Sequence, residues 1–302
     1  AFKKGMSTGD NARFIRGWSE VSLEDIIFKC SSNEESLSFT QKWYPINYGG
    51  TYRKWYGNQH SVANWLHNGE EMKSNATILN NGGHWSRYIT STDYFFRPGL
   101  SWNAISSGNI CVRYFADGFI FCSASMCGYG ESIKPVIGLL NSKVATDILK
   151  VLAPTMNYGP LQVKEIPYIE KIKEYTPTIE HNIDIAKSDW DAHETSWDFQ
   201  RNELLTIDAE TYADNIQYQI EKHEKETGEK ICIDPAAPEL GSLAWRMEQY
   251  KLKWEKLFMQ LHANEEELNR QFIDIYGLQD ELTPDVPLDE VTILQQGEIS
   301  IE

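Results

Sequence analysis

The chain changes character near residue 170, and this change limits the folds that it can adopt. Up to that point turn signals recur at short intervals, for example at Asn47–Gly50, Asn80–Gly83 and Asp117–Gly118. This spacing is typical of short strands joined by tight turns. Beyond it, long charged stretches favour helices. We therefore predict an α+β protein: a mixed α/β domain over residues 1–170, a helical domain over 171–282, and an acidic, mobile tail over 283–302.

Apolar spacing predicts the main elements within these parts. The segments Ile110–Phe115 and Phe119–Cys122 flank an Asp-Gly turn, which predicts a β-hairpin. Apolar residues at helical spacing predict one helix over Ile133–Leu152, ended by Pro154. The second half is expected to contain three helices and one short strand, over Ile172–Phe199, Ala209–Thr227, Ser242–Tyr276 and Val291–Ile293.

The charge of the chain is distributed very unevenly. A net charge of -16 argues by itself against a nucleic-acid partner. However, residues 1–150 contain 15 Lys and Arg against 12 Asp and Glu, whereas residues 151–302 contain 13 against 32. The acidity therefore belongs to the second half, and the first half can still present a cationic face to phosphate groups.

Several classes of protein are not expected from this sequence. It has no apolar stretch of about 18 residues, so we expect no membrane span. The 5 cysteines contain no C-x-x-C pair, which favours buried thiols in a reducing cytoplasm over a zinc site. The acidic residues are spread over helical faces, and a magnesium site therefore is not expected.

The sequence also lacks the motifs of DNA methylation. Amino-methyltransferases hold the flipped base with a loop that contains a Pro-Pro pair, and this chain has no such pair. It has no glycine-rich strand-to-helix turn that would bind a nucleotide-like methyl donor. We therefore expect no catalytic residue and no cofactor site within this chain.

One segment has the composition of a DNA-binding surface. Between residues 42 and 58, cations that can neutralise phosphates alternate with aromatics, glycines and amides that can contact sugars and base edges. Arg53 and Lys54 favour DNA contact because their burial would demand partners, whereas Trp43 and Trp55 are equally consistent with core packing. The candidate DNA-binding residues in this segment are Lys42, Asn47, Tyr52, Arg53, Lys54, Tyr56 and Asn58.

A second candidate surface follows the glycine pair at Gly82 and Gly83. The polar loop after this pair contains His84, Ser86 and Arg87, whose side chains could extend to a DNA ligand. An ordinary surface loop would have the same composition, and the sequence leaves both interpretations open.

Several short motifs follow one another over nearly the whole chain. They are Gly5–Arg16, Lys42–Asn58, Val62–Trp65 with Asn68–Gly69, Gly99–Trp102 with Ile105–Gly108, Leu139–Lys143, Pro154–Tyr158, Ile166–Pro167, Glu266–Arg270 and Ile275–Pro284. Their order resembles the C-terminal target-recognition part of large bacterial adenine-specific DNA methyltransferases of the phage-defence (BREX) branch. This part is similar to type IIG and type I specificity domains.

The resemblance implies sequence-specific recognition of double-stranded DNA. It also implies that an N-terminal domain absent from this chain methylates adenine N6 from S-adenosylmethionine, within a restriction–modification or phage-defence system. The family does not specify which side chains read bases. The alternative is a protein-interaction scaffold that docks other defence proteins or phage inhibitors.

Overall fold

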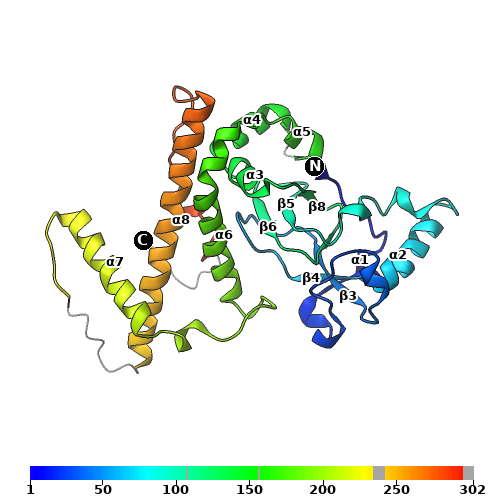
Figure 1. The fold of residues 1–302 in the computed structure, drawn as a ribbon, viewed down its shortest axis with the longest axis horizontal. Helices are drawn as coiled ribbons and strands as arrows, with labels where there is room; N and C mark the ends of the chain where they lie inside the picture. Colours follow the sequence, from blue (N-terminus) through cyan, green and yellow to red (C-terminus); the bar gives the residue numbers. More distant parts are fainter. Residues whose placement is uncertain (107, 156, 234–241, 295–302) are drawn as a thin grey trace.

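A computed structural model describes residues 1–106, 108–155, 157–233 and 242–294. The first half contains two small sheets, and long helices of the second half stand beside them (Figure 1). This arrangement confirms the predicted α+β class. None of the described helices is long and apolar enough to span a membrane.

The first sheet has the strand order β1-β8-β5-β6 and is antiparallel throughout. Its central strand β5 contributes Leu100 and Trp102, which are fully buried. The helix α3 packs against β5 and β6 and covers them. The strands are β1 (Phe2–Lys3), β5 (Gly99–Asn103), β6 (Val112–Phe115) and β8 (Ser125–Gly128).

The second sheet has the order β2-β4-β3-β7, and β3 pairs in parallel with β7. The predicted hairpin over 110–122 is therefore wrong, because β6 and β7 belong to different sheets. The turn between them is held by other parts of the chain: Gly118 N–H donates to Phe96 O at 3.1 Å, and Phe96 N–H donates to Phe119 O at 2.7 Å. The strands are β2 (Ile15–Gly17), β3 (Trp43–Asn47), β4 (Ser61–Asn64) and β7 (Ile120–Phe121).

The helix predicted over 133–152 is interrupted at Asn141 and Ser142. Its two pieces are α3 (Ile133–Leu140) and α4 (Lys143–Leu152). The Asn141 amide accepts from Val112 N–H at 2.8 Å and donates to Val112 O at 2.9 Å, and Ser142 accepts from Ala145 N–H as the N-cap of α4. The break therefore places the Asn141 amide where it hydrogen-bonds both backbone polar groups of Val112 in β6.

The remaining elements are short in the first half and long in the second. The acidic helices begin and end on local signals: Asp208 and Ser242 cap their first turns, and Gly228 and Gly277 end them at φ values of 75° and 67°. The α-helices are α1 (Asn11–Phe14), α2 (Leu66–Leu79), α5 (Pro160–Lys164), α6 (Thr176–Asp191), α7 (Ala209–Thr227) and α8 (Leu243–Tyr276). The 3-10 turns are η1 (Trp18–Glu20), η2 (Leu23–Asp25), η3 (Glu35–Leu37), η4 (Trp85–Arg87), η5 (Thr92–Tyr94), η6 (Glu170–Tyr175), η7 (Glu203–Leu205) and η8 (Leu288–Glu290).

A single hydrophobic cluster crosses the predicted boundary near residue 170. It joins Trp102 and Ile137 of the first half to Ile179 and Phe272 of the second. At Gly138 the contact between α3 and α6 is close, because an added Cβ would lie 2.4 Å from the Ile179 side chain. The boundary itself remains a prediction, but the two parts share a core.

Part of the tail predicted over 283–302 packs against the rest of the chain, and the mobility of the tail remains a prediction. Val291, Thr292 and Ile293 are buried, and they form no strand although their β-branched sequence predicted one. They lie against Lys54, whose N–H donates to Thr292 Oγ1 at 3.0 Å. Residues 295–302 lie outside the described part of the chain.

Candidate nucleic-acid interface

Arg53 and Lys54 lie inside the protein and not on its surface. Their exposed fractions are 4% and 3%. The Arg53 guanidinium forms an ion pair with Asp189 of α6 and donates from Nε to Tyr56 O at 2.9 Å. The Lys54 ammonium forms an ion pair with Glu265 of α8. Each cation therefore faces a carboxylate of the acidic half.

The expectation that these two cations contact phosphate is therefore corrected by the structure. The argument that their burial would demand partners was sound. The partners exist, but they lie 136 and 211 positions further along the chain. Since both charges are already neutralised and removed from the surface, they are not accessible to DNA in this structure.

We call residues 286–294 the C-terminal strap. Besides their ion pairs, Glu265 and Asp189 each accept a further hydrogen bond, one from Trp55 and the other from the strap. Glu265 Oε1 accepts from Trp55 Nε1–H at 2.6 Å, and Asp189 Oδ1 accepts from Leu294 N–H at 3.0 Å. Because Trp55 is 1% exposed, it belongs to the core, as one of the two sequence interpretations allowed.

Three further candidates from this segment are also buried. Tyr56 donates to Gln59 Oε1 at 3.1 Å, and Asn58 donates to Thr51 O at 2.9 Å. The Nδ2 of Asn47 has no hydrogen-bond partner among the described residues. With exposed fractions of 5% to 7%, Tyr56, Asn47 and Asn58 cannot reach a base edge in this structure. Their role in DNA contact is corrected for the same reason as that of Arg53 and Lys54.

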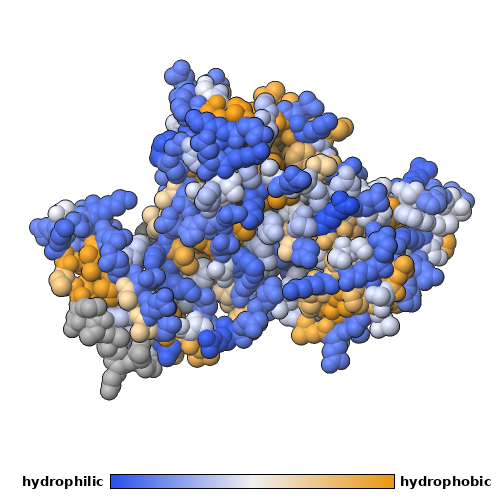
Figure 2. Space-filling model, in the orientation of Figure 1, coloured by the Kyte–Doolittle hydropathy of each residue, from blue (hydrophilic) through white to orange (hydrophobic). Residues whose placement is uncertain are grey.

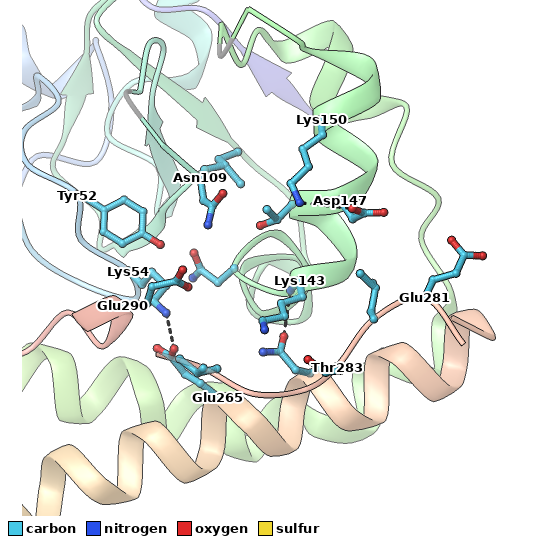
Figure 3. A pocket seen from close by; sticks show the side chains of 16 residues that line it. Tyr52, Lys54, Asn109, Lys143, Asp147, Lys150, Glu265, Glu281, Thr283 and Glu290 are labelled. Atoms are coloured by element: carbon cyan, nitrogen blue, oxygen red, sulfur yellow. Dashed lines mark hydrogen bonds and ion pairs between the residues drawn. The ribbon is translucent and has the colours of Figure 1, made fainter. Parts of the chain in front are cut away.

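Tyr52 is half-buried and lines a cavity of about 360 Å³ between α4, α8 and the strap (Figure 3). Burial raises the pKa of its hydroxyl well above the usual value. Three lysines line this cavity, but so do four carboxylates: Asp147, Glu265, Glu281 and Glu290. A cavity with this balance does not favour a polyanion. The described residues contain no group of three or more His, Cys, Asp or Glu that could hold a metal ion.

The remaining candidates are accessible and come from two neighbouring elements. Lys42, His84, Ser86 and Arg87 are all exposed. Lys42 lies just before β3, and its carbonyl accepts from Trp65 N–H at 3.0 Å, at the start of α2. The η4 turn containing Ser86 and Arg87 packs on α2. The structure thus brings these residues to the outer side of the first half, where α2 lies at the edge of the molecule (Figure 1).

The loop before η4 is held by its own polar groups. Asn80 Nδ2 donates to His84 O at 3.0 Å, and His84 Nδ1 lies 2.8 Å from Ser86 Oγ. Arg87 Nη1 lies 3.5 Å from Asn80 Oδ1, so its guanidinium stays on the surface without a carboxylate partner among the described residues. These hydrogen bonds hold the loop in place, and the side chains of His84, Ser86 and Arg87 remain exposed.

Lys73 was not singled out from the sequence and belongs to the same surface. Its ammonium lies 5.3 Å from the ring centroid of Trp65 and 4.8 Å from that of Trp85. Partial burial lowers its pKa below the usual value. The sequence spacing did not predict this contact, because Trp65 precedes α2 and the left-handed residues His67–Gly69 interrupt the helical spacing between Trp65 and Lys73. We call Lys42, Lys73, His84, Ser86 and Arg87 the α2–η4 face.

The start of α2 has an unusual backbone. His67, Asn68 and Gly69 have φ values of 49°, 57° and 70°, in the left-handed region. The Trp65 ring lies over Gly69 so closely that an added Cβ would lie 2.5 Å from it. Strained backbone of this kind persists only where surrounding contacts stabilise it. Here the left-handed turn fixes the position of α2 relative to Trp65.

Comparisons with known proteins identify relatives of the chain. No family model matches it. It is 33% identical over 302 residues to the adenine-specific methyltransferase PglX of Lacticaseibacillus casei (strain Zhang), a match that covers 96% of this chain and 22% of that protein. It is 30% identical over 231 residues to the adenine-specific methyltransferase BrxX of Escherichia coli O9:H4 (strain HS), covering 74% of this chain and 18% of BrxX. The chain thus spans about a fifth of the length of these relatives.

A likeness to a solved structure is weaker. The type IIL restriction–modification enzyme MmeI, solved in complex with DNA, matches with a TM-score of 0.41 and 12% identity, over 94% of this chain and 33% of MmeI. At that level the likeness carries no argument about fold or mechanism.

Proposed function

Because the chain is homologous to a part of the adenine-specific methyltransferases PglX and BrxX, we propose that it is the DNA-recognition module of an enzyme of this kind. The observation that carries the proposal is the match to PglX over 96% of the chain. The module would select a sequence in double-stranded DNA and present it to a separate catalytic domain. A cytoplasmic location, where its DNA substrate lies, belongs to the same proposal.

The division of labour follows from what this chain lacks. It contains no Pro-Pro loop to bind a flipped adenine and no glycine-rich nucleotide turn. Methylation of adenine N6 from S-adenosylmethionine would therefore take place on the part of the longer enzyme that this chain does not cover. This chain would supply register and orientation on the duplex.

We place the DNA contact on the α2–η4 face. Lys42 and Arg87 are exposed, and neither forms an ion pair within 4 Å of a carboxylate among the described residues, although Lys42 is close enough to Glu71 to contribute to lowering the pKa of that carboxyl. Both cations can therefore neutralise phosphates. A guanidinium can also bind guanine through two hydrogen bonds. His84 and Ser86 add donors and acceptors beside it on an ordered loop. The Lys73 ammonium lies near the rings of both Trp65 and Trp85 and adds a third cation to the face.

The proposal is tested by measuring duplex binding of the 302-residue chain at several salt concentrations. Arg87→Ala and Lys42→Ala are each expected to weaken binding and to reduce the salt slope by about one. Lys251→Ala, an exposed lysine on α8, is the matched control and should leave both quantities unchanged. Equal binding by all variants would place the DNA elsewhere, and no binding by the unaltered chain would contradict the function itself.

The alternative, a protein-interaction scaffold, is favoured by one observation. Val151 and Leu161 are 80% and 76% exposed. Figure 2 shows hydrophobic surface near the top of the view, over α4 and α5, where these residues lie. Val151→Asp combined with Leu161→Asp would leave duplex binding unchanged but abolish association with a defence protein if the scaffold interpretation is correct.

A further inference from the structure

We propose that Asp189 and Glu265, two carboxylates of the acidic half, are positioning residues for DNA recognition. They would hold the segment Arg53–Asn58 and, through it, the strands that support the α2–η4 face. This inference rests on the proposed function for its consequence in DNA binding. Its structural content, that two carboxylates hold this segment in place, can be tested without DNA.

The segment occupies a critical place in the chain. It lies in the connection between β3, which Lys42 precedes, and β4, which is followed directly by α2. The two strands pair with each other, so a shift of their connection would move both ends of the face together. Any residue that holds this connection therefore acts on Lys42 and on α2.

The backbone of the segment requires outside support. Trp55 and Asn58 have φ values of 71° and 58°, and Gly57 between them has 119°. Side chains other than glycine rarely adopt such values, and each costs energy that surrounding contacts must supply. Gly57 also lies against Arg53 and Trp190, where an added Cβ would come within 2.5 Å of Arg53 Nε and 2.8 Å of the Trp190 ring.

The two carboxylates supply that support. Glu265 binds both the Lys54 ammonium and the Trp55 indole N–H, and Figure 3 shows the contact with Lys54 at the floor of the cavity. Asp189 binds the Arg53 guanidinium. Both carboxylates have side-chain exposures of 4% or less. A buried cation is tolerated only while its counter-charge is present, so each pair ties the segment to a helix of the acidic half.

The C-terminal strap completes the enclosure. Thr292 Oγ1 accepts from Lys54 N–H at 3.0 Å, while Leu294 N–H donates to Asp189. A second set of contacts lies nearby: Trp18 Nε1 donates to Thr195 O at 2.8 Å, and Trp197 packs on Phe28 and Phe119. The acidic half thereby holds the first half in place through buried contacts, although its own negative charge would repel DNA.

The first test compares charge-removing variants with matched controls on the same helices. Glu265→Gln is paired with Glu267→Gln on α8, and Asp189→Asn with Asp184→Asn on α6; both control positions are more accessible to solvent. Trypsin cleavage after Arg53 and Lys54, followed by mass spectrometry, reports release of the segment. We expect cleavage there to accelerate roughly tenfold or more in the two test variants and to stay unchanged in the controls. Equal cleavage in test and control variants would overturn the inference.

The second test separates positioning from direct phosphate contact. The double variant Lys54→Met with Glu265→Gln removes both charges and keeps an acceptor for the Trp55 indole. This variant lacks the trypsin site after residue 54, so the readout is cleavage after Arg53, which we expect to return to the slow rate of the unaltered chain. We also expect it to bind DNA as tightly as the unaltered chain, with the same salt slope. Weaker binding with a slope lower by about one would show that Lys54 itself contacts phosphate, which contradicts the inference.

These outcomes stay informative in two difficult cases. If the single variants do not fold, the double variant still decides between the two roles of Lys54. If the unaltered chain binds no DNA, the proposed function fails, whereas cleavage at Arg53 and Lys54 continues to test whether the carboxylates hold the segment.

Discussion

Arg53 and Asp189 form an ion pair in which neither side chain is more than 5% exposed, although 136 positions separate them. A pair of this kind adds little net stability while intact, because desolvation offsets much of the attraction. Its loss is costly, since the remaining charge stays buried. The acidic half therefore supplies a contact that the segment Arg53–Asn58 needs in order to keep its structure.

A fragment of residues 1–177 is expected not to fold by itself. It would retain Arg53 and Lys54 without their partners, at a cost of roughly 3–5 kcal/mol for each, and would expose the core that Ile137 shares with α6 and α8. Circular dichroism and thermal unfolding of this fragment test the expectation. A cooperative fragment that binds DNA would instead establish the boundary near residue 170 as a division between independent domains.

Gly69→Ala is expected to destabilise the chain by about 1–3 kcal/mol. The residue has a φ of 70°, and its new Cβ would lie 2.5 Å from the Trp65 ring. Chemical denaturation would measure the change. Gly130→Ala is the control, because nothing lies within 4 Å of its added Cβ. Similar stabilities of the two variants would show that α2 does not depend on the left-handed turn.

Thiol labelling should distinguish Cys232 from the other cysteines. Cys232 is exposed, whereas Cys30, Cys111, Cys122 and Cys127 are buried. Burial raises the pKa of Cys30 to about 11, so its reactive thiolate does not accumulate at pH 8. We expect one rapidly labelled thiol in the native chain and all 5 after denaturation. Rapid native labelling of Cys30 would contradict its burial.

The same thiol gives a pH dependence with a definite sign. Its pKa in the folded chain lies above the ordinary value of 9.0. The protonated thiol is therefore favoured by folding, and its contribution to stability is complete below pH 9 and declines as pH rises toward 11. A Cys30→Ala variant should show less of this decline when the free energy of unfolding is followed across that range.

The chain is expected not to bind S-adenosylmethionine. It has neither the glycine-rich turn nor the Pro-Pro loop that would surround the methyl donor and the target base. Calorimetric titration should show no binding isotherm. A one-to-one isotherm would mean that this chain contains a cofactor site of a different construction.

Local signals allowed part of the fold to be predicted from the sequence. The helix α7 was predicted with its observed bounds, and α8 within one residue, because Asp208, Gly228, Ser242 and Gly277 act on neighbours within a few positions. The resemblance to adenine-specific DNA methyltransferases was likewise visible in the order of short motifs, and the matches to PglX and BrxX confirm it. Hydrogen bonds of caps and turns join residues close in sequence, so the residue pattern alone was sufficient for these features.

Other features depended on residues that meet only in the folded chain. The separation of β6 from β7 depends on Phe96, and the break before α4 depends on the contact between Asn141 and Val112. The same is true of the candidate site. Whether Arg53 and Lys54 face DNA or the interior was decided by Asp189 and Glu265, because a cation is stable inside a protein only where folding brings a counter-charge to it.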